Sequence, residues 1–177
     1  ANIGGYVTPF GAMIGSINIH RNAQSLYRTP LIGIDMRCMI TNTPPIGAYR
    51  GAGRPEGNYV MERMIEEAAR VSGIDAVSLR KRNHIRPEEL PFTTGVGTIY
   101  DCGDFTGLLD AALEAADYKG FAARKAESVS RGKLRGIGVG QYLEITAPPT
   151  NELGEIIFEE DGGVLMRTGT LDFGQGH

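Results

Sequence analysis

The chain has 177 residues, enough for one or two compact domains with a sizeable core. Its 18 basic and 21 acidic residues are scattered and leave a net charge of −3, which excludes the concentrated positive field typical of nucleic-acid binding. No apolar run approaches the ~20 residues that span a bilayer, and no charged leader precedes an apolar core. We therefore predict a cytoplasmic protein without a membrane span.

Cysteine usage and the two ends of the sequence give two further expectations. Cys38 and Cys102 lie far apart, without the spacing of a disulfide framework or a zinc site, so we expect ordinary, partly buried thiols. The sequence begins at Ala1 without a methionine and stops at His177 within a glycine-rich stretch. We therefore predict a segment of a longer polypeptide.

Glycine is the one compositional outlier, because 25 residues are about twice the usual share of ~7 %. The glycines cluster at 47–57, 132–140 and 162–176. A residue without Cβ lets the backbone bend sharply or approach a ligand closely, so these clusters mark candidate loops.

The first forty residues predict one helix and one strand. Small and polar residues between Pro9 and Pro30 favour a short helix near 12–26. In residues 31–40, apolar and other residues alternate with the period of a strand that has one buried face.

A glycine loop follows at residues 46–56, with the sequence Ile-Gly-Ala-Tyr-Arg-Gly-Ala-Gly-Arg-Pro-Glu. Two glycines and an alanine between Arg50 and Arg54 leave backbone amides uncovered, so an anionic group can approach them. Pro55 suits the first helical position and Glu56 the first turn, so the loop leads into a helix N-terminus, whose partial positive charge favours anions. The pattern predicts an anion cradle.

Apolar residues at helical spacing follow this loop and predict a helix that ends at Ser72-Gly73. Asp75 is expected to cap a second helix that runs to Asn83. We expect ordinary core packing from the apolar stripe of the first helix and solvent contact from its charged side. The stripe consists of Val60, Met64, Ala68 and Val71 with Met61 and Ile65, and the charged side of Glu62, Arg63, Glu66, Glu67 and Arg70.

The remaining residues predict a connection, two helices and strands. Residues 87–103 are rich in proline and glycine and are interpreted as a link between two domains. Asp104 begins a helix, and a second helix is expected from about Lys119 to Ser130. Alternation then predicts strands at 137–145, 155–159 and 164–168, the last two joined by a turn at Asp161-Gly162-Gly163. The Gly-x-Gly-x-Gly run at 136–140 has no following helix, which argues against a dinucleotide loop.

The glycine loop, together with Asn58-Tyr59-Val60-Met61-Glu62-Arg63 and Leu79-Arg80-Lys81-Arg82-Asn83, closely resembles the molybdopterin-binding large subunit of the molybdenum hydroxylases. That family includes xanthine dehydrogenase, aldehyde oxidase and aerobic carbon monoxide dehydrogenase, and the chain is most similar to the carbon monoxide dehydrogenase-like members. The final residues, Gly169 to His177, resemble the family's second cofactor loop, which is built on Gly-Gln-Gly. The two motifs stand in the family's order, and the resemblance covers most of the chain.

The resemblance also implies which residues meet the cofactor. These are Arg50, Gly51, Ala52, Gly53, Gly174, Gln175, Gly176 and His177. Arg50 is implied to lie against the molybdenum centre, Gln175 to hydrogen-bond the pterin, and Ala52 to face the substrate. Glu144 and Thr146 are implied along the substrate channel. The family's general base is a glutamate expected downstream of His177, so no catalytic residue and no metal ligand is assigned to this segment.

Two positions depart from the better-known members of the family. Gly51 stands where carbon monoxide dehydrogenases proper carry a cysteine whose thiolate holds copper, and glycine supplies no such ligand. Ala52 stands where xanthine dehydrogenase carries an aromatic residue that sandwiches a purine. Copper-assisted oxidation of carbon monoxide and tight purine stacking are therefore not expected.

We predict an α+β fold, with mixed sheets and packed helices, that spans two molybdopterin-binding domains. Residues 1–86 would end the first domain, 87–103 would connect, and 104–177 would begin the second. The parent protein would be an oxidoreductase that hydroxylates an aldehyde, an N-heterocycle or a similar carbon centre with water, and the segment alone would be inactive. The resemblance also implies FAD and iron-sulfur clusters on partner subunits or domains. It further implies contact with the rest of the large subunit and assembly into a dimer of heterotrimers.

Two alternatives remain open. The chain could be a catalytically inactive structural or interaction segment that has lost the cofactor, which Arg50 facing solvent and a distant Gly174–Gly176 loop would favour. It could also be a nucleotide-binding module, which requires a strand of a parallel sheet that ends directly at Arg50.

Overall fold

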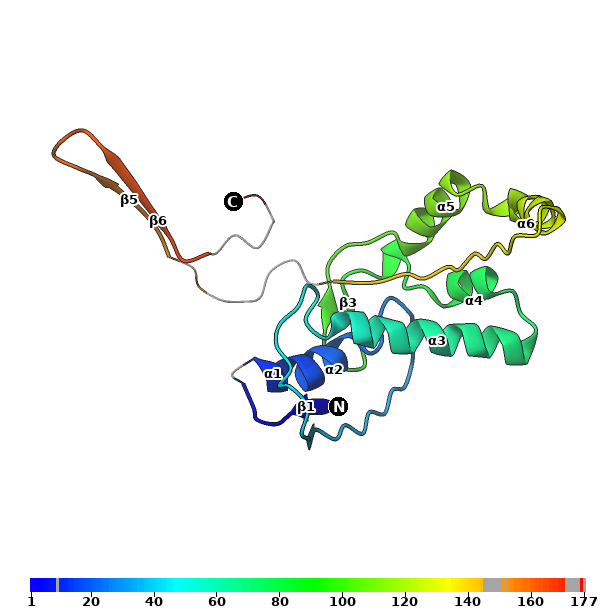
Figure 1. Ribbon diagram of the computed structural model, residues 1–177, viewed down its shortest axis with the longest axis horizontal. Helices are drawn as coiled ribbons and strands as arrows, with labels where there is room; N and C mark the ends of the chain where they lie inside the picture. The colour runs from blue at the N-terminus through cyan, green and yellow to red at the C-terminus, as the bar shows by residue number, and fades with distance from the viewer. Residues whose placement is uncertain (9, 145–150, 152, 171–175, 177) are drawn as a thin grey trace. The chain divides into compact units, whose positions relative to one another are not determined.

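A computed structural model of the chain describes residues 1–8, 10–144, 151, 153–170 and 176 (Figure 1). The chain divides into two compact units, Ala1–Glu144 and Ile145–His177. The described residues form helices and three two-stranded sheets, one parallel and two antiparallel. The predicted α+β class is therefore confirmed.

The N-terminal part of the first unit combines a short parallel pair with a helical stretch. Asn2–Gly4 (β1) pairs with Met39–Ile40 (β2). Helix α1 (Gly11–Met13), a π-helical turn (Ile14–Asn18) and helix α2 (Ile19–Asn22) follow one another without a break. This stretch confirms the helix predicted near 12–26, which ends earlier than expected.

The strand predicted for residues 31–40 is wrong except at its end. Only Met39 and Ile40 are in a strand, and both are exposed, as are Leu31 and Ile34. An alternating pattern becomes a strand only where another strand can pair along its length. In the described part of the chain, β1 pairs with the last two residues alone.

Helix α3 (Arg54–Ser72) is the longest helix of the described chain and is bounded by two glycines. Gly53 before it and Gly73 after it have φ values of 93° and 71°, in the left-handed region that glycine adopts without strain. Helix α3 packs against α2 and against α4 (Ala76–Asn83), as Figure 1 shows. Asp75 accepts a 2.8 Å hydrogen bond from the Ser78 amide and caps α4 as predicted, and this bond holds the pKa of Asp75 below its ordinary value.

The inward face of α3 differs from the predicted apolar stripe. Val60, Met64 and Val71 are exposed, whereas Asn58 and Ala69 are buried. Glu62, expected to face solvent, has only 12 % of its side chain exposed. The amphipathic pattern fails here because the inward face carries a charge that is satisfied by another buried charge.

That partner is Arg80 of α4, whose side chain is 0 % exposed. Its guanidinium donates two hydrogen bonds to Glu62 Oε2, at 3.0 and 2.9 Å, and lies 2.8 Å from Glu66 Oε1. It also donates to the carbonyls of Ala76 and Val139 at 3.2 and 2.8 Å. Burial on its own lowers the pKa of Arg80, but the hydrogen bond that Arg80 donates to Glu66 and the attraction of Glu62 outweigh burial and raise that pKa.

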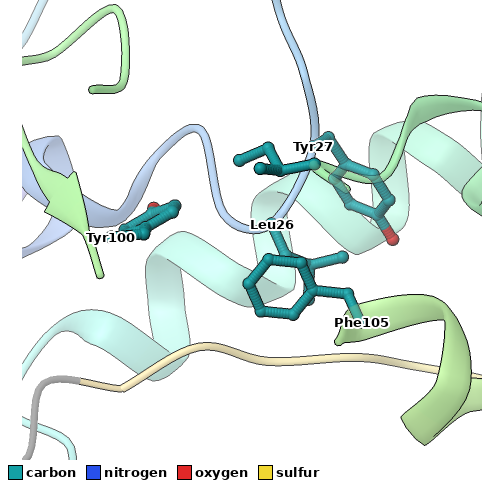
Figure 2. Packing of buried hydrophobic residues seen from close by; sticks show 5 residues of the cluster. Leu26, Tyr27, Tyr100 and Phe105 are labelled. Atoms are coloured by element: carbon teal, nitrogen blue, oxygen red, sulfur yellow. The ribbon is translucent and has the colours of Figure 1, made fainter. Parts of the chain in front are cut away.

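An apolar cluster lies beside this ion pair. Figure 2 shows Leu26 and Phe105 against each other, with Tyr27 and Tyr100 to either side. Ile85 completes the buried set, and Met61, Ile65, Leu90, Phe92 and Leu143 pack around it. The cluster joins the end of the first helical stretch to α3, to the start of α5 (Phe105–Ala115) and to the chain near 143.

The middle of the chain contains the two helices predicted after Asp104. A 3₁₀ turn (Pro87–Glu89) precedes the antiparallel strands β3 (Phe92–Thr93) and β4 (Ile99–Tyr100). Asp104 accepts a 2.8 Å bond from the Gly107 amide at the start of α5. A 3₁₀ turn (Tyr118–Gly120) and α6 (Phe121–Ser130) follow, so both predicted helices are confirmed.

Two other expectations for the first unit are wrong. The described residues of the strand predicted at 137–145, which are 137–144, form no strand, because they bond to side chains of α3 and α4 and not to another strand. Cys38 and Cys102 are both exposed, since each lies in irregular chain outside the core.

The second unit contains a hairpin. Strands β5 (Gly154–Phe158) and β6 (Val164–Thr168) pair in antiparallel register, with Ile156 opposite Met166 and Phe158 opposite Val164. The strands and the turn predicted from the sequence are confirmed. Across the described parts of both units, no helix combines the length and apolar character needed to cross a membrane.

Replacing Arg80 with methionine tests whether this ion pair holds the first unit together. Arg80→Met leaves the carboxylate of Glu62 in a largely buried site without its cation, and we expect a loss of about 3–5 kcal/mol in unfolding free energy. Urea denaturation measures the loss. Arg70→Met removes an exposed arginine paired with Glu67 on the same helix and should cost less than ~0.5 kcal/mol. Equal losses of unfolding free energy in Arg80→Met and Arg70→Met would contradict a special role of the buried ion pair in stability.

Candidate cofactor site

The glycine loop has an unusual backbone. Gly51, Ala52 and Gly53 have φ values of 93°, 45° and 93°, so three consecutive residues lie in the left-handed region. The amide of Ala52 donates to the Tyr49 carbonyl at 2.7 Å, and that of Arg54 to the Gly51 carbonyl at 3.1 Å. The chain therefore turns tightly twice before α3 begins.

Side chains are excluded at both glycines of this turn. A Cβ on Gly53 would lie 2.1 Å from the carbonyl oxygen of Ile14, and a Cβ on Gly51 would lie 2.5 Å from the ring of Pro55. Such distances cannot occur without movement of the backbone. Glycine is required here both by φ and by space.

Two asparagines of the first helical stretch hold the loop by hydrogen bonds to its carbonyls. Asn18 Nδ2 donates to the Ala52 carbonyl at 2.7 Å, and Asn22 Nδ2 donates to the Arg54 carbonyl at 3.2 Å. The backbone amides of Arg50, Gly51 and Gly53 donate to no acceptor in the described part of the chain. The carbonyls are thus satisfied while amides remain for an anionic or oxygen-rich ligand at the N-terminus of α3.

A groove of about 790 Å³ opens beside this loop. Arg50, Gly51 and Pro55 form one side, Tyr59 and Glu62 of α3 continue it, and residues 140–144 form the other side. Tyr59 and Tyr142 are both exposed on the groove. A smaller cavity of about 120 Å³ lies on the other side of Arg50, against Ile14 and Gly53.

A polar stripe on α3 fixes the opposite wall of the groove. It consists of Arg54, Asn58 and Glu62, spaced four residues apart and therefore on one helix face. Asn58 Nδ2 donates to the Leu143 carbonyl at 3.1 Å, and its Oδ1 accepts from the Leu143 amide at 3.3 Å. Glu62 Oε2 accepts from the Gln141 amide at 3.1 Å. Arg54 Nη1 lies 3.0 Å from Glu144 Oε1.

The side chains below the stripe form a buried polar network. The Tyr27 hydroxyl donates to Glu62, and burial, followed by this contact, raises the pKa of Tyr27. Gln141 donates through Nε2 to the Phe105 carbonyl at 3.0 Å, so its Oε1 accepts from His84 Nε2 at 2.8 Å. His84 is stacked on Tyr27 with ring centroids 5.7 Å apart, and burial holds the pKa of His84 below its ordinary value.

The polar stripe is the part of the site that sequence analysis missed. Resemblance placed Glu144 near the substrate but named no partner for it, and Asn58 was not singled out. The four-residue spacing of polar residues at positions 54, 58 and 62, directly after the glycine loop, is the signal that could have shown an inward polar face.

The residues assigned to the cofactor divide between the two units. Arg50 is exposed and borders the groove, Gly51 and Ala52 are half-buried, and Gly53 is buried. Gly176 is exposed with φ +85°, whereas Gly174, Gln175 and His177, together with Thr146, lie outside the described residues. The described residues contain no group of three or more His, Cys, Asp or Glu side chains that could hold a metal ion.

The structure bears differently on the two alternative functions, a nucleotide-binding module and an inactive segment that has lost the cofactor. The nucleotide-binding module lacks its required strand, because β2 ends at Ile40 and no strand precedes Arg50 directly. Exposure of Arg50 is one of the two observations expected for an inactive segment, and the other involves Gly174 and Gln175, outside the described residues.

Comparison with known proteins decides the family. One model described as a molybdopterin cofactor-binding domain matches residues 1–84, and a second with the same description matches residues 111–177. The chain belongs to the molybdopterin cofactor-binding family. The resemblance noted in the sequence is thereby confirmed.

Known members of the molybdopterin cofactor-binding family are much longer than this chain. The carbon monoxide dehydrogenase large chain of Hydrogenophaga pseudoflava is 32 % identical over 85 % of this chain and 21 % of its own length. The 6-hydroxypseudooxynicotine dehydrogenase complex subunit gamma of Paenarthrobacter nicotinovorans is 30 % identical over 85 % of this chain and 20 % of its own. The crystal structure of quinoline 2-oxidoreductase from Pseudomonas putida 86 matches all of this chain and 24 % of that protein, with a TM-score of 0.85 and 29 % identity.

The described site fits a molybdopterin cofactor chemically. A pterin phosphate and molybdenum-bound oxygens are hydrogen-bond acceptors, and the loop offers unpaired amides beside the guanidinium of Arg50. The glycines allow close approach of such a group, because neither position could carry a side chain. Which of these residues contact the cofactor remains a prediction.

His84 makes the stability of the first unit sensitive to acid. Because burial lowers its folded-state pKa below the unfolded value of about 6.5, the unfolded chain binds the proton more tightly. The contribution of His84 to stability is complete above about pH 6.5 and is lost as pH falls toward the folded pKa, at no more than ~1.4 kcal/mol per pH unit. Urea unfolding between pH 7.5 and 5.5 measures this slope. His84→Gln should flatten it, while substitution of the exposed His20 by glutamine should keep it; an unchanged slope in His84→Gln would refute the assignment.

Proposed function

We propose that this chain is part of the molybdenum cofactor-binding subunit of an oxidoreductase that hydroxylates an aldehyde, an N-heterocycle or a similar carbon centre with water. The observation that carries the proposal is the glycine loop at the N-terminus of α3, which has three residues in the left-handed region and unpaired amides, two of them on Arg50 and Gly51, which line the groove. Membership of the molybdopterin cofactor-binding family supports the choice of ligand.

In this proposal each part of the loop has its own task. The amides of Gly51 and Gly53 and the guanidinium of Arg50 bind acceptor oxygens of the cofactor. Ala52, which lines the smaller cavity and not the groove, contacts the substrate from there. Gly174, Gln175, Gly176 and His177, implied by the family resemblance alone, are proposed as further cofactor contacts. The bound cofactor supplies the redox chemistry, and the general base belongs to a downstream part of the subunit, so this segment alone is inactive.

Three considerations favour a heteroaromatic or aldehyde substrate over carbon monoxide. Gly51 supplies no thiolate for copper. Relatives named for quinoline and for 6-hydroxypseudooxynicotine are similar over 85 % or more of the chain. The exposed rings of Tyr59 and Tyr142 on the groove suit a flat aromatic ligand.

The larger assembly follows from the same proposal. Residues 1–86 end the first molybdopterin-binding domain, 87–103 connect, and 104–177 begin the second; the matches of two family models to 1–84 and 111–177 support this division. FAD and iron-sulfur clusters reside on partner subunits or domains, which receive electrons from the cofactor, in a cytoplasmic dimer of heterotrimers.

Molybdenum content of the full-length polypeptide tests this proposal. We expect about one molybdenum per polypeptide in the wild type and, because a Cβ on Gly53 would meet the Ile14 carbonyl, a loss of about tenfold or more in Gly53→Ala. Gly73→Ala is the matched control, since Gly73 also has positive φ but ends α3 away from the loop, with no atom within 4 Å of an added Cβ.

The outcomes separate the proposal from its alternative. Retention of molybdenum in Gly73→Ala with loss in Gly53→Ala, at equal thermal stability, supports the cofactor loop. A wild-type protein that contains no molybdenum when isolated from its source would favour an inactive segment that has lost the cofactor. Equal loss in both variants would assign the effect to stability and not to the loop.

A further inference from the structure

The ion pair between Arg54 and Glu144 borders the groove through Glu144, which lines it. Arg54 Nη1 lies 3.0 Å from Glu144 Oε1 and 3.5 Å from the Gly51 carbonyl oxygen. A Cβ placed on Gly51 would lie 3.6 Å from Glu144 Oε2. The carboxylate therefore stands directly beside the loop, and any ligand held at Gly51 meets the pair.

Two guanidinium groups lie close to the groove: Arg50 lines it, and Arg54 is paired with Glu144, which also lines it. Arg54 is neutralised by Glu144, and its side chain is 17 % exposed. Arg50 has no carboxylate partner among the described residues and is exposed. The other carboxylate on the groove, Glu62, is committed to Arg80. The groove therefore presents one uncompensated positive charge, and the charge of Arg54 is masked.

Glu144 is held in this position by the chain before it. Asn58 bonds both the carbonyl and the amide of Leu143, and its Oδ1 also accepts from the Ser25 hydroxyl at 3.0 Å. Asn58 is buried, so these bonds are protected from water. Arg54 and Asn58 lie one helical turn apart on α3. The bonds from Asn58 to the Leu143 backbone and the ion pair of Arg54 therefore hold two consecutive residues, Leu143 and Glu144.

We propose that Glu144 is a specificity-determining residue that masks Arg54 and so makes the site discriminate against aromatic ligands that carry a carboxylate. Arg50 alone serves the anionic cofactor, and the paired Arg54 offers no second cation to a substrate carboxylate. Removal of the negative charge of Glu144 releases Arg54 as an anion-binding group next to the groove. This inference rests on the proposed function only in taking the groove as the substrate side of the cofactor site.

The test compares the binding of a neutral aromatic and its carboxylated form to the full-length protein. Dissociation constants of quinoline and of a quinoline monocarboxylate are measured by isothermal titration calorimetry at pH 7.5, without turnover. In Glu144→Gln we expect the carboxylate to bind about tenfold more tightly relative to quinoline than in the wild type, the gain of one charge-assisted hydrogen bond. The double variant Arg54→Gln/Glu144→Gln should return to the wild-type ratio, and raised salt should shrink the gain.

Glu67→Gln is the matched control, because it removes the same charge from an exposed Glu–Arg pair on α3 outside the groove. Its ratio should equal that of the wild type. An unchanged ratio in Glu144→Gln, an equal gain for both ligands, or failure of that variant to bind the carboxylate would overturn the inference. Molybdenum is quantified on the same preparations. Its absence would refute the proposed function, whereas an unchanged ratio in a molybdenum-containing protein would refute only the role of Glu144.

Discussion

The buried contact between Arg80 and Glu62 is the interaction on which the first unit depends. Arg80 joins two helices and also the chain at Val139, so three segments that are distant in sequence share one guanidinium. A buried charge is tolerated only when most of its hydrogen-bonding groups are satisfied, and here carboxylates and carbonyls surround it. The groove keeps its shape because this contact fixes the face of α3 from which its wall is built.

The same contact explains why the glycine loop and the groove wall are fixed relative to each other. Helix α3 begins at the glycine loop, and its polar stripe then bonds the wall in order along its length: Arg54 at Glu144, Asn58 at Leu143 and Glu62 at Gln141. Side chains of the helix thus replace the neighbouring strand that an extended segment ordinarily requires. Loop and wall cannot shift independently, since both are attached to a single helix.

Much of the local structure could be predicted from the sequence because it depends on nearby residues. Glycines at 53 and 73, the caps at Asp75 and Asp104 and the turn at Asp161-Gly162-Gly163 act over a few residues, and the structure has each element where they indicate. The resemblance identified the family for a related reason, since its motifs are short and contiguous.

The inward face of α3 could not be predicted because it depends on partners far away. From the sequence alone, Glu62 is expected to face solvent, as most glutamates do. It is buried only because the fold brings Arg80 of another helix and Gln141 into contact with it. Residues 31–40 failed for the opposite reason: their alternation was right for a strand, but no partner extends along them in the described chain. Hydrophobic periodicity describes what a segment can bury and contains no information on what will cover it.

The bonds of the polar stripe also constrain the order in which the first unit folds. Arg80 and Glu62 are 18 residues apart, but Asn58 and Leu143 are 85 apart and Glu62 and Gln141 are 79 apart. Contacts that close long loops are entropically costly until other structure has shortened the effective distance. The helical pair of α3 and α4 is therefore expected to assemble first and the groove wall to close late. Newly made chains would pass through a state that has the glycine loop but no groove, in which the loop remains open to solvent on the side where the groove later forms.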